Sequence, residues 1–185
     1  MALIDRVKNI LLSPKTEWPK IAGETATVQS LYVDYILILA AIGPIAMALR
    51  FSVFGITFAI LTYIVNLVIT YLLALIVDAL APTFGGEKNF IQSLKLTAYS
   101  YTAAWAAGIF HLVPAIGGII GLLAGIYSFY TFYLGVTVMK KCPQEKAIPY
   151  TLVVVLCGIV LGALLGGVLT SMIIGGNPMM GGLTG

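Results

Sequence analysis

The sequence predicts an all-α, polytopic membrane protein: a bundle of five transmembrane helices preceded by a short amphipathic helix at the membrane interface. Of its 185 residues, 60% are apolar and only 9% are charged, whereas about one-quarter of the residues of a globular domain are charged. Long intervals of the sequence carry no charge, and the Lys and Arg residues are unevenly placed. These observations argue against a soluble enzyme, a nucleic-acid-binding protein and a secreted disulfide-stabilised domain.

The predicted helices follow from four intervals without Asp, Glu, Lys or Arg. These intervals are residues 35–49, 51–77, 96–139 and 147–185. A helix needs about 20 apolar residues to cross the hydrocarbon core, so the 96–139 interval holds two crossings, with a turn near Pro114. The five helices are expected at about 31–50, 54–79, 95–113, 117–139 and 149–174.

The distribution of basic residues predicts the orientation of these helices. If the N-terminus is cytoplasmic, nine of the ten Lys and Arg residues lie on the cytoplasmic side, and only Arg50 lies on the other. Cytoplasmic loops carry such an excess of positive charge. We therefore expect a cytoplasmic N-terminus and, on the opposite side, a C-terminus with a flexible tail over residues 175–185. Met179 and Met180 in this tail are interpreted as linker rather than as copper ligands.

Residues 1–30 are predicted to form a cytoplasmic amphipathic segment ahead of the transmembrane domain, which spans residues 31–174. Apolar side chains recur at helical spacing at Leu3, Ile4, Val7, Ile10 and Leu11. Charges interrupt the apolar face and no small-residue cleavage site follows, which argues against a signal peptide. We expect this helix to lie on the cytoplasmic leaflet, with the Trp18 ring at the membrane interface.

Two predicted helices carry glycines at four-residue intervals, which suggests close helix packing. The two series are Gly117, Gly121 and Gly125 on the fourth helix, and Gly158, Gly162 and Gly166 on the fifth. Small residues let helix backbones approach closely in lipid. We expect these strips to pack against each other or against a neighbouring protomer; the alternative is that glycine is simply frequent in membrane helices.

Polar side chains within the predicted spans point to interhelical contacts. Asn66 lies on one ridge of the second helix with Thr62 and Thr70, and an amide must face protein because lipid offers it no hydrogen-bond partner. We expect Asn66 to bond a hydroxyl of the third helix, at Thr97, Ser100 or Thr102; the alternative is that it lines a path for a polar solute. Tyr127, Tyr130 and Tyr133 are interpreted as an interfacial belt rather than a ligand platform.

Ionisable side chains are expected at both ends of the bundle. The topology brings Asp34, Asp78 and Lys95 to the cytoplasmic ends of the first three helices, where they form a salt-bridged cluster, an ion site or a docking point, or else extend separately to the lipid headgroups. Arg50 and His111 lie at the opposite face. A lone histidine without a second His or nearby Cys does not predict a metal site.

No catalytic motif is present: neither HExxH nor a phosphate-binding loop occurs, and no Ser, His and Asp combination has a plausible context. The sequence therefore predicts a protein that is not an enzyme and has no cofactor. The expected partners are the lipid bilayer and either a second copy of the chain or another membrane protein, with no nucleic acid.

Three stretches of the chain resemble the bacterial branch of the Yip family, the Ypt/Rab-interacting membrane proteins. They are Arg6–Pro14 followed by Glu17, Trp18 and Glu24; Leu96–Ser100; and Val113–Pro114 followed by glycines, Tyr127 and Tyr133–Gly135. The likeness covers about residues 6–175. One departure is that Ala103 and Ala104 stand where the bacterial pattern has proline.

The resemblance implies a multi-pass protein of the bacterial cytoplasmic (inner) membrane with a cytoplasmic N-terminus. For eukaryotic relatives it also implies binding of prenylated small GTPases. Those relatives carry a long cytosolic segment with an Asp-Leu-Tyr-Gly-Pro-like motif, which this sequence lacks, so we do not carry GTPase binding over to it.

Two hypotheses for function follow. The first is a non-catalytic membrane protein that acts through helix packing, partner binding or membrane organisation. The second is a small transporter or channel with a polar pathway between helices two, three and four, lined by Asn66, Asp78 and the tyrosines. An ionisable group at mid-span would favour the second hypothesis, and none is present.

Overall fold

The computed structural model describes residues 2–50 and 52–175, and within these ranges the chain is helical with no strand. The predicted tail therefore lies, from residue 176 onward, outside the described residues, as do Met179 and Met180. The all-α fold class is confirmed.

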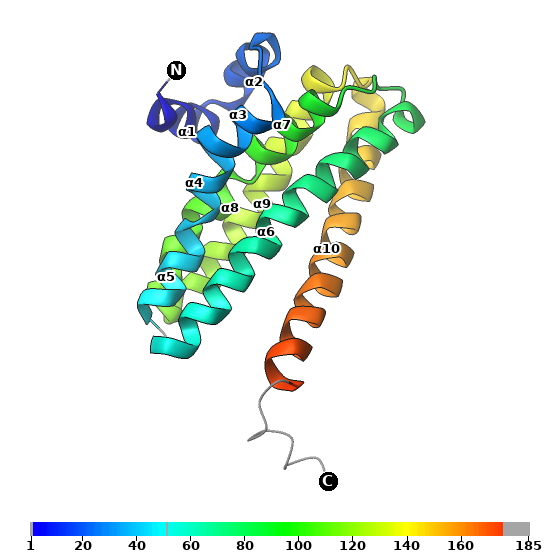
Figure 1. Cartoon of the computed structure of the whole chain (residues 1–185). Helices are drawn as coiled ribbons and strands as arrows, with labels where there is room; N and C mark the ends of the chain where they lie inside the picture. The colour runs from blue at the N-terminus through cyan, green and yellow to red at the C-terminus, as the bar shows by residue number, and fades with distance from the viewer. Residues whose placement is uncertain (1, 51, 176–185) are drawn as a thin grey trace.

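Two short helices form a hairpin at one end of the bundle: α1 (Leu3–Leu12) and α2 (Pro14–Gly23) (Figure 1). Proline is well tolerated at the first position of a helix, where its missing N–H has no intrahelical partner, and Pro14 begins α2 in this way. The hairpin packs on the bundle through Ile10, Trp18 and Ile21, each at most 1% exposed. The prediction that Trp18 seeks the membrane interface is therefore wrong, because its ring lies inside the protein. Ile4 and Leu12 remain exposed.

The first long segment is interrupted several times. It consists of α3 (Val28–Leu31), a π-helical turn η1 (Tyr32–Ile36), α4 (Leu37–Ala40) and α5 (Ile42–Arg50). Thr27 begins it with a capping box, in which its hydroxyl accepts from the Ser30 N–H and the Ser30 hydroxyl accepts from the Thr27 N–H. A π-helical turn is rare and is frequently found at functional sites.

The second, fourth and fifth segments are long helices. They are α6 (Ser52–Leu80), continued by the 3-10 turn η2 (Ala81–Phe84), α9 (Pro114–Met139) and α10 (Gln144–Gly175). Each begins before the position expected from the sequence, because uncharged stretches locate the lipid-spanning part rather than the helix ends.

The third segment is broken and deeply enclosed. It comprises α7 (Phe90–Ser100), α8 (Thr102–Ala107) and the 3-10 turn η3 (Gly108–Leu112), so the helix is interrupted although no proline is present. Every residue from Ser93 to Ser100 is buried. Near its end, a Cβ atom on Gly108 would lie 2.7 Å from the Gly43 Cα, which shows that η3 and α5 touch backbone to backbone.

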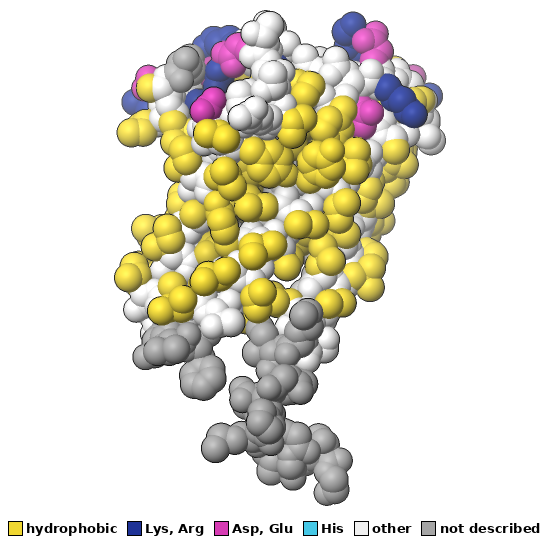
Figure 2. All heavy atoms as spheres, viewed as in Figure 1, with side chains coloured by type: hydrophobic (Ala, Val, Ile, Leu, Met, Phe, Trp, Pro, Cys, Tyr) yellow, Lys and Arg dark blue, Asp and Glu magenta, His cyan; other side chains and the backbone are white. Residues whose placement is uncertain are grey.

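Among the described residues, four helical segments are long and apolar enough to cross a membrane: Val28–Arg50, Gly55–Phe84, Ala115–Met139 and Gln144–Ser171. The third segment also runs the length of the bundle, from the α2 end to α5, but in pieces. The expected count of five crossings therefore stays a prediction. Hydrophobic side chains cover most of the height of the face in Figure 2, and charged side chains gather at the end that carries α1 and α2.

Candidate functional site

The charged end of the bundle is held together by Arg6. Its guanidinium donates to the Glu17 carboxylate at 2.6 Å and also bonds Glu24, and it lies over the Tyr99 ring, 5.7 Å from the ring centroid. The Arg6 side chain is 6% exposed and that of Glu17 is 1% exposed. A buried charge requires such compensation by partners, so α1, α2 and α7 are locked together here.

Four further hydrogen bonds from Lys95, Trp18 and Tyr127 tie the hairpin to the bundle. The Lys95 ammonium donates to the backbone carbonyls of Ile21, at 2.9 Å, and Glu24. The Trp18 indole donates to the Thr131 carbonyl at 3.0 Å, and the Tyr127 hydroxyl donates to the Leu11 carbonyl at 2.7 Å. Tyr127 thus anchors α1 rather than belonging only to an interfacial belt.

A second polar cluster lies where α6, α7 and α9 meet. The ammonium of Lys140, which follows α9, lies 2.8 Å from Asp78 and 2.7 Å from the Ser93 hydroxyl, and also donates to the Asn89 carbonyl at 3.1 Å. Asp78 in addition accepts from the Asn89 N–H and the Ser93 hydroxyl. Burial lowers the pKa of Lys140, and Asp78 opposes that shift.

The expected cluster of Asp34, Asp78 and Lys95 is therefore not formed. Asp78 pairs with Lys140, which the charge pattern placed only in a loop. Lys95 binds backbone carbonyls of the N-terminal hairpin. Asp34 is exposed on the π-helical turn η1.

Asp34, Arg6 and Lys95 do share a hollow under the hairpin. It has a volume of about 890 Å³ and is also lined by Glu24 and Tyr99. Arg6 and Lys95 already have protein partners, so we interpret this hollow as the boundary between the hairpin and the bundle rather than as a ligand site.

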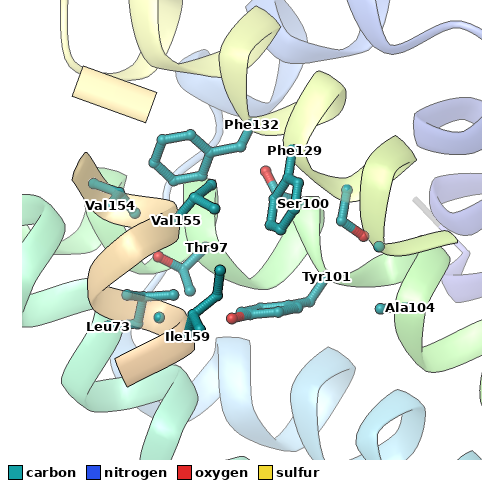
Figure 3. A pocket seen from close by; sticks show the side chains of 13 residues that line it. Leu73, Thr97, Ser100, Tyr101, Ala104, Phe129, Phe132, Val154, Val155 and Ile159 are labelled. Atoms are coloured by element: carbon teal, nitrogen blue, oxygen red, sulfur yellow. The ribbon is translucent and has the colours of Figure 1, made fainter. Parts of the chain in front are cut away.

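A smaller cavity of about 210 Å³ lies deeper, between α10 and the rest of the bundle. Figure 3 shows side chains from α6, α7, α9 and α10 converging on it. Its lining is mostly apolar and holds no charged side chain, but it includes Ser100, Ser128 and Tyr101. The Ser100 and Ser128 hydroxyl oxygens are buried and have no hydrogen-bond partner within the described part of the chain.

An adjoining cavity of about 340 Å³ reaches Asn66. It shares Tyr101, Ala104 and Gly158 with the first cavity, and its lining extends to Thr62 and His111. The predicted bond from Asn66 to the third helix is not formed. Thr97 and Thr102 instead donate to the Ser93 and Tyr99 carbonyls, while Asn66 faces the cavity.

The two glycine strips do not pack against each other. A Cβ atom added at Gly121, Gly125, Gly162 or Gly166 would meet no atom within 4 Å outside its own helix and chain neighbours. Gly117 lies against the Phe110 carbonyl, and a Cβ at Gly158 would lie 3.6 Å from Leu73. The intramolecular half of the prediction is wrong, and most of both strips faces outward or into the cavities.

At the opposite end, the structure brings Arg50 and His111 together. The Arg50 guanidinium donates to the His111 carbonyl at 3.2 Å, and the His111 Nδ1 lies 2.7 Å from the Gly108 carbonyl. Within residues 2–50 and 52–175, no group of three or more His, Cys, Asp or Glu side chains could hold a metal ion.

Sequence reasoning missed the Arg6–Glu17 pair, Ser128 and the role of Lys140, and it named Ser100 only as a candidate partner of Asn66. Ser13–Pro14 ends α1 and permits the hairpin that brings Glu17 to Arg6. The Arg6–Glu17 pair could therefore have been predicted from this break in the sequence. Nothing in the sequence marks the hydroxyls of Ser100 and Ser128 as unpaired, because a serine hydroxyl in a helix usually bonds its own backbone.

The sequence model of the Yip1 domain matches residues 8–165, close to the range over which the family resemblance was drawn. No curated protein and no solved structure matches the chain. The match spans most of the sequence, from within α1 to within α10, and covers three of the four long apolar segments entirely and most of the fourth. The chain therefore belongs to the Yip1-domain family of membrane proteins.

Proposed function

We propose that the chain is a non-catalytic integral membrane protein that acts by associating, through α9 and α10, with a second copy of itself or with another membrane protein. The observation that carries this proposal is the uncovered glycine strip of α10. Gly162 and Gly166 have no neighbour within 4 Å of an added Cβ, and only 11% of the most apolar window of this helix is buried, against 39% in the first segment.

Close backbone approach drives helix association in lipid, where there is no hydrophobic force between helices. The smooth face at Gly162 and Gly166, where an added Cβ meets no atom within 4 Å, is suited to a partner helix. The exposed Ile159 beside it would add van der Waals contact.

The test is self-association of the purified chain in lipid nanodiscs or vesicles, measured by energy transfer between labelled copies. Gly166→Leu should abolish the transfer while leaving the fold of the single chain intact, because an added Cβ there meets no atom within 4 Å and Gly166 lines neither cavity. Leu164→Ala, on the opposite side of the same helix, is a matched control and should retain most association. Equal energy transfer for Gly166→Leu and the parent would contradict a self-associating strip.

We also propose that the protein resides in the cytoplasmic membrane of a bacterium, with its N-terminus in the cytoplasm. The gathering of charged side chains at the hairpin end and the placement of basic residues support this orientation. A reporter fused after residue 185 should be active only outside the cytoplasm; activity in the cytosol would contradict an odd number of crossings.

A second candidate is a small transporter or channel, which the cavity at Asn66 favours. The two cavities share lining residues between α6, the third segment and α10. Asn66→Leu places an apolar side chain in that space and should abolish any solute flux into reconstituted vesicles. The sequence suggested that Asp78 also lines the pathway, but Asp78 lines neither cavity. Asp78→Asn should therefore lower the stability of the protein rather than block a pathway directly. Absence of flux above protein-free vesicles would remove this candidate.

A further inference from the structure

The cavity of about 210 Å³ between α9 and α10 has a closed floor and an open side. Its floor is formed by buried side chains, among them Thr97, Phe132 and Val154, each at most 5% exposed. At its rim stand Phe129 on α9, 41% exposed, and Ile159 on α10, 59% exposed. Since both rim residues lie within helices apolar enough to span a membrane, the cavity opens sideways into the hydrocarbon region.

Two hydroxyls in this cavity lack partners that their neighbours have. Thr97 and Thr131 donate to the carbonyls four residues earlier, at 2.9 Å each, which is the usual way for a hydroxyl to be satisfied in a helix. Ser100 and Ser128, on the same helices, do not, although each is only 5% exposed. A buried polar group without a partner is unfavourable, so both hydroxyls are available to a ligand.

A third donor stands beside them. The Tyr101 phenol lines the same cavity and makes no side-chain hydrogen bond to another described residue. In Figure 3 its hydroxyl points toward Ile159 at the rim. Donors are thus present both at the floor and at the mouth of the cavity.

The remaining lining defines the class of ligand. Its other side chains are apolar apart from Thr97, and three aromatic rings line it, those of Tyr101, Phe129 and Phe132. Without a charged group, the cavity favours an uncharged molecule. Its volume is below the roughly 300–1,000 Å³ of pockets that enclose a drug-sized ligand, so it would hold one end of a longer molecule whose remainder lies in the bilayer.

We propose that this cavity binds an uncharged, lipid-soluble carbonyl compound that enters sideways from the membrane, with the Ser100 and Ser128 hydroxyls donating hydrogen bonds to its carbonyl oxygens. The apolar walls and aromatic rings contact the body of the molecule. A carbonyl is favoured over an alkyl chain alone, because its oxygen can accept from both hydroxyls at once and an alkyl chain leaves them without partners. Of the α10 glycine strip, Gly158 lines this cavity and Gly162 and Gly166 do not, so binding here does not depend on self-association through those two glycines.

The probe is a para-benzoquinone carrying a decyl chain, with decylbenzene as its counterpart without carbonyls. Trp105 reports binding, because its ring stacks on that of Tyr101 with the centroids 5.8 Å apart and quinones quench indole fluorescence. In nanodiscs, the parent should show a saturable quenching component above the linear component caused by partitioning into lipid. Decylbenzene should displace the quinone poorly.

Three variants test the site. Gly125→Leu fills the cavity, since Gly125 lines it and an added Cβ meets no atom within 4 Å; it should remove the saturable component. Gly121→Leu, one turn away and equally open but outside the lining, should leave it unchanged. Ser100→Ala combined with Ser128→Ala should weaken quinone binding roughly tenfold, as expected for the loss of hydrogen bonds of ordinary net strength.

Saturable quenching that persists in Gly125→Leu would overturn the proposed site. Equal binding of the quinone by the double alanine variant, or equal competition by decylbenzene, would overturn the role of the hydroxyls. If Gly125→Leu does not yield a monodisperse protein, the double alanine variant decides the proposal, because it removes only unpaired oxygens and leaves the packing unchanged.

Discussion

The two ends of the bundle are built on different principles. At the hairpin end, buried charges and long-range hydrogen bonds join segments far apart in the sequence, as in the bonds of Arg6 to Glu17 and Lys140 to Asp78. Away from that end, α10 diverges from α6 toward its C-terminal end (Figure 1), Gly162 and Gly166 are uncovered, and the Ser100 and Ser128 hydroxyls lack partners among the described residues. The difference indicates that the hairpin end supplies most of the specific stability, whereas the open side is free to bind.

The largest loss of stability is expected from a substitution that breaks the polar cluster of Lys140 and Asp78 at the hairpin end. Lys140→Met leaves Asp78 without its cation, and removal of one partner of a buried pair typically costs about 3 kcal/mol or more. Reversible unfolding in mixed micelles measures this loss. Lys141→Met is the matched control: its pair with Glu87 is 69% and 63% exposed, so little change is expected. Equal effects of the two substitutions would contradict the division between the two ends.

The next effect compares glycines from the two regions. A Cβ at Gly135 would lie 2.5 Å from the Trp18 ring and 2.6 Å from Leu96, so Gly135→Ala should destabilise the fold by about 2 kcal/mol through overpacking. Gly166→Ala meets open space and should not destabilise. Thermal denaturation of both variants in the same detergent provides the comparison, and an unfolding temperature for Gly135→Ala at or above that of Gly166→Ala would refute it.

A smaller loss of stability is expected when Trp18, which anchors the hairpin to α9, is substituted. Trp18→Phe keeps an aromatic ring but removes the indole donor to Thr131, a loss of about 1 kcal/mol for the hydrogen bond, with some further loss of packing. Limited proteolysis should then cut first within residues 1–23. Unchanged cleavage kinetics at these residues would show that the hydrogen bond does not hold the hairpin in place.

The smallest effect has the opposite sign. Thr62 has a buried hydroxyl without a partner among the described residues, so Thr62→Val should be neutral or stabilising by less than about 1 kcal/mol. Thr70→Val, two positions further along the same ridge, loses a hydrogen bond to the Asn66 carbonyl at 2.8 Å and should be slightly destabilised. Unfolding in mixed micelles resolves the sign, and destabilisation by Thr62→Val would argue that the hydroxyl is satisfied in the membrane.

The sequence predicted those parts of the fold that depend on composition. Uncharged intervals located the long apolar segments, because lipid excludes charge over a length that can be counted. The uncharged intervals did not predict that the third segment is broken at Tyr101, because neither proline nor glycine marks the interruption. Packing of Gly108 against Gly43 and enclosure by neighbouring segments accompany that break, and neither has a local signal.

Of the candidate site, the sequence predicted which residues are polar but not their partners. Asp78, Lys95 and Asn66 were all identified, yet the helix ends brought Lys140 to Asp78 and left Asn66 at a cavity. Partner choice depends on the rotation and depth of each helix, which the positions of charges along the chain do not specify. The resemblance to the Yip family covered nearly the same residues as the family match.

The hydrogen bond from Trp18 to Thr131 joins residues 113 positions apart, and this has a consequence for biosynthesis. The ribosome releases the N-terminal hairpin long before its acceptor on α9 has been translated. Until then, this hydrogen bond cannot form, although Lys95 on α7, which bonds the Ile21 and Glu24 carbonyls, is translated earlier. Docking of the first twenty-three residues is thus a late step of assembly, completed only after the fourth segment has been inserted.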